Sequence, residues 1–376
     1  MIAKTTAFSF PPRSRLGRSA GLGLAAAAAL VVTACGTPST GSATSASTAT
    51  KSASSHASFS ACVMISDTGI ADHSFNQAAW AAMTEAKSNL GITIKYLEQS
   101  GSLDFSTIGQ DFVQDGCNMI IGVGFDTETT IDTLAKANPS IKFTVIDDTL
   151  TTPESNATSL TYQTNQASFL GGYLAAGMSK SGVIGVYGNE AIAPVELYMS
   201  GYVYGAEYYN KVHGTNVKVI GWNPATQTGQ FVGSFTDVNK GKLITEAEIQ
   251  QGADIIFAVA GPIDEGTAEA VQAAGGPSSG YYMLWVDSDG CETNPDACGQ
   301  ILSTVQKNIQ PSLYQVIAKT VDGDFPTGEY LGTLTNNGVG LAPYHQLASK
   351  VPSTLQNEIT ALEADVASGK VAVKSY

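Results

Sequence analysis

One segment of the chain combines an aromatic ring with polar groups that could recognise a small molecule. It reads Asp67-Thr-Gly-Ile-Ala-Asp-His-Ser-Phe-Asn-Gln77. Phe75 offers a flat apolar face, and Asn76 offers one acceptor and two donors, which suits the edge of a nucleobase. The alternative is purely structural: Ser74 or Asp72 caps the following helix and Phe75 packs beneath the turn.

Signatures of common enzyme classes are missing from the sequence. There is no P-loop, no Gly-x-Gly-x-x-Gly that opens a helix after a strand and no Gly-x-Ser-x-Gly elbow between a strand and a helix; the Gly-x-Ser-x-Gly at 276–280 follows a helical pattern instead. The four histidines are scattered without metal-ligand spacing. Asp287-x-Asp289-Gly290 resembles the start of a calcium loop, but the remaining ligand positions are absent. We therefore expect no enzyme activity, no cofactor and no metal.

Composition excludes two further classes. Of the 376 residues, 43% are hydrophobic and only 14% are charged, so the chain as a whole is not disordered. The formal net charge of −14 argues against binding to the phosphate backbone of nucleic acid, which depends on Lys and Arg.

The elements that must position the first segment alternate between strands and helices from residue 61 onward. Strand-like runs cover residues 62–66, 92–97, 118–124, 142–146, 159–162, 182–187, 217–221, 254–260 and 282–286. Helical patterns cover residues 74–89, 105–114, 127–137, 165–178, 195–211, 237–250 and 264–274. This alternation indicates parallel sheets covered by helices on both faces. Because about ten strands are too many for one comfortable sheet, we predict an α/β fold with two doubly wound, Rossmann-like lobes.

Ligands of such sheets bind beyond the carboxyl ends of the strands. The loops at those ends are therefore the candidate binding loops. They cover residues 67–74, 124–127, 147–152, 188–194, 222–235, 261–264 and 287–299.

The N-terminal segment has the pattern of a secretory signal. Basic residues precede an apolar run at 21–32 that is too short to span a bilayer. The run ends Val32-Thr-Ala-Cys-Gly36, which resembles a bacterial lipobox; the alternative is a chance Cys after an ordinary signal peptide. We expect a signal peptide at 1–34, a lipidated Cys35 and a tether at 35–60, because Ser, Thr and Ala make up 19 of the 25 residues at 36–60. The protein would be extracytoplasmic and held at the cell membrane only by its lipid.

Four cysteines remain once Cys35 is lipidated, and an extracytoplasmic chain can keep disulfides. Cys62 and Cys117 stand at the starts of two strand-like runs, while Cys291 and Cys298 close a short polar loop. We pair them as 62–117 and 291–298, one of three possible connectivities. Buried, reduced thiols are the alternative for the first pair.

Seven blocks together resemble the basic membrane protein family. These are lipoprotein receptors for purine nucleosides that serve ABC transporters as substrate-binding proteins and have the type I periplasmic-binding fold. The blocks are Asp72-x-Ser74-Phe75-Asn76-Gln77, 118–125 (NMIIGVGF), 143–148 (FTVIDD), 166–178 (QASFLGGYLAAGM), 253–261 (ADIIFAVAG), 284–289 (LWVDSD) and 303–307 (STVQK). The resemblance covers about residues 61–320, and the order and spacing of the blocks make it specific.

This resemblance implies how the base would be held. Phe75 and Phe235 would clamp it between the two lobes, and Asn76 and Asp72 would contact its edge or order the loop. Packing in the core at a helix start is the alternative for Phe235.

The same resemblance implies the ribose side of the site. Asp147, Asp287 and Lys307 would hold the sugar hydroxyls, beside the turn that begins at Gly261. The alternatives are a loop cap for Asp287 and a solvated helix face for Lys307. This turn departs from the family because Pro262 and Asp264 stand where the family tends to have Gly, so another small glycoside stays open as the ligand.

The resemblance also implies a hinge and partners. Three crossovers near residues 163, 288 and 328 would join an N-terminal lobe (61–163 plus 289–328) to a C-terminal lobe (164–288 plus 329–376). We expect a monomer that binds a nucleoside-like molecule and delivers it to an ABC permease, without nucleic acid as a partner. The alternatives are a sensor of the same fold without transport and, third, an enzyme such as a nucleoside hydrolase.

Overall fold

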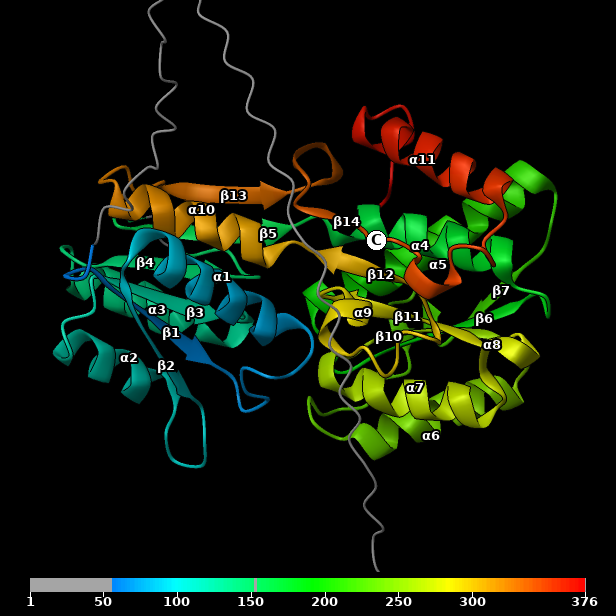
Figure 1. Ribbon diagram of the computed structural model, residues 1–376, viewed down its shortest axis with the longest axis horizontal. Coiled ribbons are helices and arrows are strands. Elements are labelled where there is room, and N and C mark those ends of the chain that lie inside the picture. The colour runs from blue at the N-terminus through cyan, green and yellow to red at the C-terminus, as the bar shows by residue number, and fades with distance from the viewer. Residues whose placement is uncertain (1–55, 152–153, 376) are drawn as a thin grey trace, which may run out of the picture. The chain divides into compact units, whose positions relative to one another are not determined.

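The computed structural model describes residues 56–151 and 154–375. The expected signal peptide, the lipidated Cys35 and most of the tether lie outside these residues. Strands in the described part form two six-stranded sheets and a two-stranded hairpin (Figure 1). No helix within the described ranges has the length and apolar character needed to cross a membrane.

The first sheet has the strand order β13-β5-β4-β3-β1-β2, and all its neighbouring strands are parallel. Its strands are β1 (Ser60–Ile65), β2 (Thr93–Glu98), β3 (Met119–Val123), β4 (Lys142–Ile146), β5 (Ala157–Tyr162) and β13 (Gly328–Gly332). Its helices are α1 (Phe75–Leu90), α2 (Phe105–Gln114), α3 (Glu128–Ala137) and α10 (Ile309–Val321). We call this sheet with its helices the first lobe.

Alternation along β1 shows why helices cover both faces of this sheet. Ala61, Val63 and Ile65 belong to the hydrophobic cluster that includes the buried face of α1. Cys62 and Met64 point to the other side and pack with residues of α2 and α3. All five side chains are fully buried, so a strand with two apolar faces needs a helical layer on each.

The second sheet has the order β14-β12-β11-β10-β6-β7, in which only the β12–β14 pair is antiparallel. Its strands are β6 (Val183–Gly188), β7 (Lys218–Ile220), β10 (Ile255–Val259), β11 (Tyr282–Asp287), β12 (Ile301–Lys307) and β14 (Val339–Leu341). Its longer helices are α4 (Thr164–Met178), α5 (Ala193–His213), α6 (Val238–Gln250), α7 (Asp264–Ala273) and α11 (Ser353–Ala367). We call this sheet with its helices the second lobe.

Short elements complete the second lobe and the loops near the carboxyl ends of the strands. They are α8 (Gly276–Ser279), α9 (Gly290–Thr293), the hairpin β8 (Trp222–Asn223) and β9 (Thr228–Gly229), and the 3-10 turns η1 (Phe125–Thr127) of the first lobe, η2 (Gly261–Ile263), η3 (Leu334–Asn336) and η4 (His345–Leu347).

Helices α4 and α5 pack closely because glycines remove side chains from their interface. A Cβ on Gly172 would lie 2.0 Å from the carbonyl oxygen of Tyr202, and one on Gly205 would lie 2.0 Å from that of Phe169. Neither position can take a larger residue without moving a backbone. The resulting close helix pair covers the face of the second sheet that carries Ile184, Phe257 and Leu284.

The chain passes between the sheets three times: after β5, after β12 and after β13. The predicted crossover near residue 288 is therefore wrong, because β12 pairs in parallel with β11 in the second sheet and the chain leaves only after Lys307. Residues 289–300 form α9 and the loop after it instead. The last crossover follows Gly332 at the end of β13, a few residues beyond the predicted position.

Both predicted disulfides are present. Cys62 in β1 bonds to Cys117 just before β3, with the Cα atoms 6.1 Å apart. Cys291 in α9 bonds to Cys298, with the Cα atoms 4.5 Å apart. The first joins neighbouring strands, and the second closes the loop that leads from β11 to β12.

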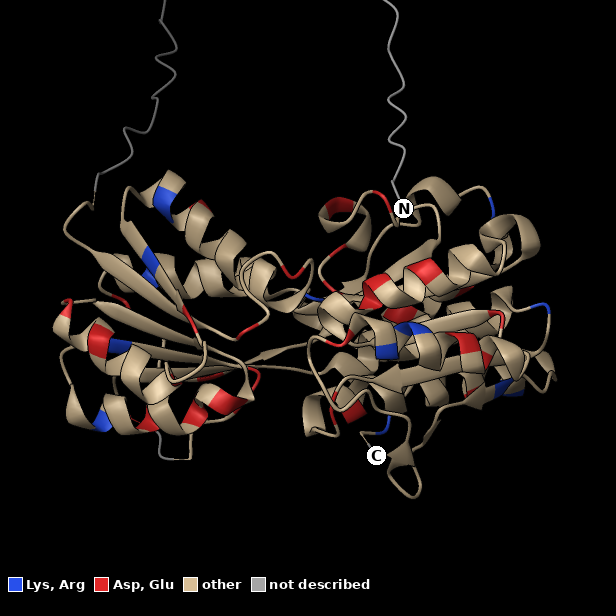
Figure 2. Ribbon diagram, turned by 90° about the horizontal axis from the view of Figure 1, so that it is seen from below, with Lys and Arg blue, Asp and Glu red and all other residues tan. Residues whose placement is uncertain are grey.

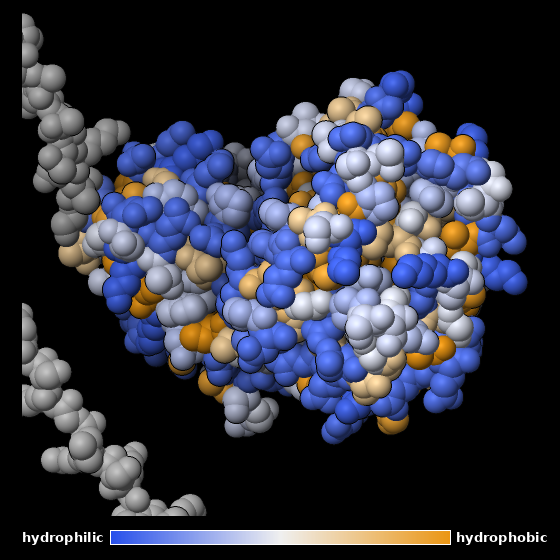
Figure 3. All heavy atoms as spheres, turned by 45° about the vertical axis from the view of Figure 1, so that its right-hand side comes forward, coloured by the Kyte–Doolittle hydropathy of each residue, from blue (hydrophilic) through white to orange (hydrophobic). Residues whose placement is uncertain are grey.

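The surface is acidic and mostly hydrophilic. Asp and Glu are spread over helices and loops of both lobes (Figure 2). Hydrophilic residues dominate the face seen in Figure 3, where hydrophobic residues lie singly or in small groups. The large hydrophobic side chains that are exposed among the described residues lie on separate elements. They are Tyr96, Phe125, Val212, Leu243 and Leu331.

Candidate ligand-binding site

A cavity of about 310 Å³ lies at the carboxyl ends of the parallel strands and takes its walls from both lobes. All eight residues predicted to bind the ligand line it. They are Asp72, Phe75, Asn76, Asp147, Phe235, Gly261, Asp287 and Lys307. Each stands on a loop or element end that follows a strand, so the fold brings them together although they span more than 230 positions of the sequence.

Asp72 organises the first loop. Its carboxylate accepts hydrogen bonds from the backbone N–H groups of Ser74, Asn76 and Gln77 at 2.8–3.0 Å. Burial raises the pKa of Asp72 to about 6, the three N–H donors lower it, and Asp287 raises it slightly. Of the two predicted roles for Asp72, these contacts favour ordering the loop over reading the ligand.

Asn76 lines the cavity and carries an amide oxygen without a hydrogen-bond partner among the described residues. Its Nδ2 donates to the hydroxyls of Ser66 at 2.8 Å and Thr68 at 2.7 Å. Its Oδ1 is buried and has no hydrogen-bond partner among the described residues. A buried polar atom without a partner is costly, so this oxygen is suited to accept an N–H or O–H from a bound molecule.

Two aromatic rings line the cavity from different lobes. Phe75 begins α1 in the first lobe, and Phe235 stands in the loop before α6 in the second. Phe75 is also packed against the main hydrophobic cluster. The four hydrophobic clusters of the described residues do not include the half-buried Phe235. The core-packing alternative for Phe235 therefore has no support in these clusters.

Lys307 is a buried cation between two carboxylates. Its ammonium lies 2.6 Å from Asp147 and 3.7 Å from Asp287, and its side chain is only 3% exposed. It also lies 4.8 Å from the ring centre of Phe75 and 5.3 Å from that of Tyr198. The burial of Lys307 therefore contradicts the alternative that it lies on a solvated helix face.

The two aspartates share an unusual backbone conformation. Asp147 has a φ of +72° and Asp287 a φ of +64°, a region that side chains other than Gly seldom adopt. Asp147 directly follows β4 and Asp287 is the last residue of β11, and the carboxylates of both lie near the ammonium of Lys307. Burial raises the pKa of Asp147, Lys307 opposes this, and Asp287 adds to it.

Tyr198 and Ser74 belong to this cluster and were not predicted from sequence. The Tyr198 hydroxyl donates to Asp287 at 2.8 Å, and the Ser74 hydroxyl donates to Asp287 at 3.0 Å. Tyr198 lies more than one turn inside α5, where no loop motif marks it. Burial and the nearby Asp287 raise the pKa of Tyr198 well above its usual range, so it stays a donor.

The turn that departs from the family pattern keeps its open backbone. Gly261 has a φ of +62°, and a Cβ built on it would meet nothing within 4 Å. Pro262 lines the cavity, whereas Asp264 is fully buried at the start of α7 and does not. Burial raises the pKa of Asp264 well above its usual range, and Asp287 adds to this, so Asp264 lies behind the cavity wall in an environment that disfavours its charge.

The first loop is hydrogen-bonded directly to the loop after β11. The hydroxyls of Ser288 and Thr293 donate to the carbonyl oxygens of Ser74 and His73, both at 2.7 Å. The Trp285 indole N–H also donates to the carbonyl oxygen of His73, at 3.2 Å. These contacts join the two lobes beside the cavity.

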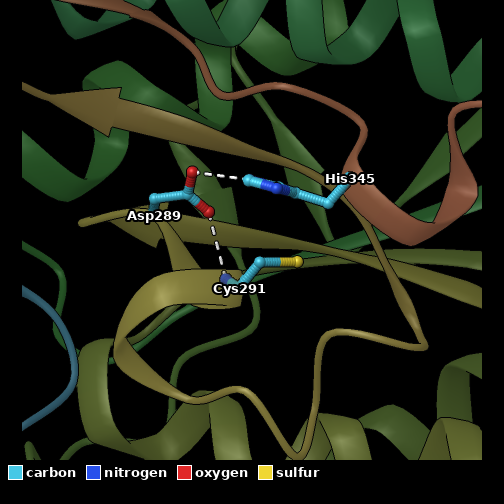
Figure 4. Close-up of side chains that lie close together, drawn as sticks. All are labelled: Asp289, Cys291 and His345. Atoms are coloured by element: carbon cyan, nitrogen blue, oxygen red, sulfur yellow. Dashed lines mark hydrogen bonds and ion pairs between the residues drawn. The ribbon is translucent and has the colours of Figure 1, made fainter. Parts of the chain in front are cut away.

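Asp289, Cys291 and His345 lie together behind this loop (Figure 4). Asp289 accepts from the backbone N–H of Cys291 at 3.0 Å and pairs with Nε2 of His345 at 2.7 Å. The sulfur of Cys291 is bonded to Cys298, so it is not a thiolate ligand. We therefore assign this group the structural role of bracing α9.

Comparison with known proteins agrees with this geometry. A family model described as ABC transporter substrate-binding protein, PnrA-like, matches residues 59–374. The ABC transporter nucleoside-binding protein BmpA of Lactococcus lactis subsp. cremoris is 27% identical over 330 residues, which cover 84% of this chain and 89% of the relative. Basic membrane protein D of Borreliella burgdorferi is 28% identical over 317 residues, which cover 82% and 86%.

Solved structures show the fold. A solute-binding protein of an ABC transporter system from Aeropyrum pernix matches with a TM-score of 0.75 at 21% identity, over 85% of this chain and 94% of that one. A second, from Conexibacter woesei, matches with a TM-score of 0.65 at 19% identity, over 84% and 99%. The two sheets, parallel except for the β12–β14 pair, thus have the type I periplasmic-binding architecture. Because the family model spans most of the chain, this protein belongs to the PnrA-like, basic membrane protein family of ABC transporter substrate-binding proteins.

Proposed function

We propose that this protein captures a purine nucleoside between its two lobes and delivers it to an ABC permease. One observation carries the proposal: a single cavity is lined by an aromatic ring from each lobe and by the Asp147–Lys307–Asp287 cluster. The name of the Lactococcus relative, a nucleoside-binding protein, supports the same ligand class.

The aromatic rings and Asn76 suit the base. A planar base between Phe75 and Phe235 would bury its apolar surface on both faces, and stacking on an aromatic side chain is worth about 1–3 kcal/mol per base. The free Oδ1 of Asn76 would accept from an N–H on the base edge. Purines carry such donors at the exocyclic amine or on the ring.

The charged cluster suits an uncharged sugar. Asp147 and Asp287 can accept from ribose hydroxyls, and the ammonium of Lys307 has further N–H donors beside them. Five aspartates and one lysine line the cavity, with the lysine already paired. A phosphate would therefore meet an excess of negative charge, which favours nucleosides over nucleotides.

The mechanism we propose is hinge closure without bond making or breaking. Ligand contacts from both lobes stabilise the closed state, with the chain segments after β5, β12 and β13 as the hinge. We further propose a monomer held on the extracytoplasmic side of the membrane by lipid on Cys35.

Calorimetric titration with adenosine, guanosine and inosine tests the ligand. Wild type should bind at least one of them, and Phe75→Ala or Phe235→Ala should each weaken binding by about 1–3 kcal/mol, up to roughly a hundredfold. Because both rings would stack on one base, the double variant should be non-additive.

Phe231→Ala is the matched control. Phe231 lies four residues before Phe235 but packs against the main cluster and Trp222, and it does not line the cavity. Its loss should lower the melting temperature with little change in affinity. If Phe235→Ala likewise lowers the melting temperature and leaves nucleoside affinity unchanged, the proposed aromatic clamp is wrong.

A further inference from the structure

A second cavity adjoins the first on the side of Asp147. Its volume is about 390 Å³, and it shares Phe125, Asp147, Ile192 and Pro194 with the first cavity. Because the two spaces have these walls in common, a group attached to a ligand beside Asp147 could extend from one into the other.

One wall of the second cavity is apolar. It is formed by the start of α5 and the residue before it, with Ile192, Ala193, Pro194 and Leu197. Phe125 of the first lobe adds an aromatic ring. A charged group placed against this wall would lose water without gaining a partner.

Two threonines also line the second cavity, and one of them has a hydroxyl that is unpaired within the described ranges. Thr161 lies near the end of β5 and Thr164 begins α4, so they flank the crossover between these elements. Thr161 already donates to Glu329 at 2.6 Å. The hydroxyl of Thr164 is buried, the residue is 1% exposed, and no partner bonds this oxygen among the described residues.

The charges at the border exclude an anion. Asp147 and Asp148 both line the second cavity, and the ammonium of Lys307 is occupied by Asp147. Burial raises the pKa of Asp148, the backbone N–H of Thr149 lowers it, and the neighbouring carboxylates of Glu128 and Asp147 raise it, so several carboxyl groups already share this edge. A phosphate here would be repelled.

We propose that the second cavity is a subsite for an uncharged substituent on the sugar end of the ligand. The substituent would combine a hydrogen-bonding group, which pairs with Thr164, with a short apolar tip that rests on Ile192, Pro194 and Leu197. The inference rests on the proposed function, since it requires the sugar to lie beside Asp147.

Three ligands test the subsite by calorimetric titration. They are the parent nucleoside, taken as whichever of adenosine, guanosine and inosine binds, its 5′-N-ethylcarboxamide and its 5′-monophosphate. The amide should bind wild type at least as tightly as the parent. The monophosphate should bind at least roughly tenfold more weakly than the parent.

Two variants locate the effect. Leu197→Trp fills the second cavity but not the first, which Leu197 does not line. It should weaken binding of the amide by about tenfold or more, and it should leave the affinity for the parent nucleoside within about twofold of wild type. Thr164→Val replaces only the hydroxyl by a methyl group and should weaken binding of the amide about three- to tenfold. Thr161→Val is the control, because the hydroxyl of Thr161 is already bonded to Glu329, and it should leave binding of the amide unchanged.

The outcomes separate this inference from the proposed function. If no parent nucleoside binds wild type, the proposed function fails. If the parent binds but the amide binds tenfold more weakly, or if Leu197→Trp affects parent and amide alike, the function stands and the subsite is wrong.

Discussion

The ammonium nitrogen of Lys307 lies 2.6 Å from a carboxylate oxygen of Asp147, although the two residues belong to different sheets. Lys307 ends β12 in the second lobe, and Asp147 directly follows β4 in the first. The same ammonium approaches Asp287 at the end of β11. One buried cation thus connects strand ends of both lobes at the wall of the cavity.

Lys307→Met should damage both stability and binding. It leaves two nearby carboxylates buried without a cation, and breaking a buried pair costs about 3–5 kcal/mol. Lys136→Met is the matched control, because Lys136 also lies 2.6 Å from its partner Asp132 but its side chain is 44% exposed. That pair should contribute only about 0.3–0.5 kcal/mol. Urea unfolding and nucleoside titration check this, and equal losses in the two variants would contradict a special role for Lys307.

The two disulfides should differ in their contribution to stability. The Cys62–Cys117 bond closes a loop of 55 residues and the Cys291–Cys298 bond one of 7. In the chain-entropy model these constrain the unfolded chain by about 4 and about 2 kcal/mol. We expect Cys62→Ser/Cys117→Ser to lower the unfolding free energy more than Cys291→Ser/Cys298→Ser. Thiol labelling of the denatured, unreduced protein should find none of these four cysteines free. Labelling of all four would show that neither disulfide forms.

Glu248 should make stability depend on pH. It is fully buried in α6, and burial raises its pKa from 4.5 to about 8. Since the pKa is higher in the folded state, folding takes up a proton between these values, so this contribution to stability falls as pH rises from about 4.5 to about 8. At roughly 1.4 kcal/mol per pKa unit, the loss is at most about 5 kcal/mol.

Glu248→Gln should remove this dependence. Relative to wild type, the variant should gain unfolding free energy between pH 5 and pH 9, measured by urea unfolding at each pH. Glu246→Gln, a half-exposed neighbour on the same helix, should follow wild type across the range. Parallel curves for Glu248→Gln and wild type would show that Glu248 does not titrate in this window.

Cys35→Ser should release the protein from the membrane. The cysteine sulfur is the atom that receives the lipid in a lipobox, so the variant should appear in the medium without lipid. Fractionation of cells and mass spectrometry of the product test this. A variant that stays bound to the membrane and is cleaved at the same position would overturn the lipidation of Cys35.

Sequence patterns predicted the strands of the cavity and the loops at their ends because both signals are local. A buried parallel strand is an apolar run, and its carboxyl end is where a polar residue such as Asp147 or Asp287 first appears. Once the strands are placed in parallel, those ends meet. Phe75 and Asn76 were selected for their own chemistry, whereas the other binding residues were implied by the resemblance to the family. All eight residues line one cavity.

What the sequence did not reveal depends on contacts between distant segments. The prediction placed residues 289–328, and with them β12, in the wrong lobe, because the pairing of β12 with β11, rather than its composition, decides the sheet. Tyr198 reaches Asp287 from within α5, and the apolar pattern of a buried helix gives no sign of that hydroxyl contact. Helices α10 and α11 lie beyond the predicted helical patterns, which end at residue 274.

Mass spectrometry of the molecule that the protein retains tests the central claim most directly. Purified protein would be incubated with an equimolar mixture of nucleosides, nucleotides, sugars and polyols, separated from free compounds by gel filtration and then denatured. We expect a purine nucleoside at about one molecule per chain, and much less from the Phe75→Ala/Phe235→Ala double variant. Retention of a nucleotide, of a sugar or polyol without a base, or of no compound at all would contradict the account.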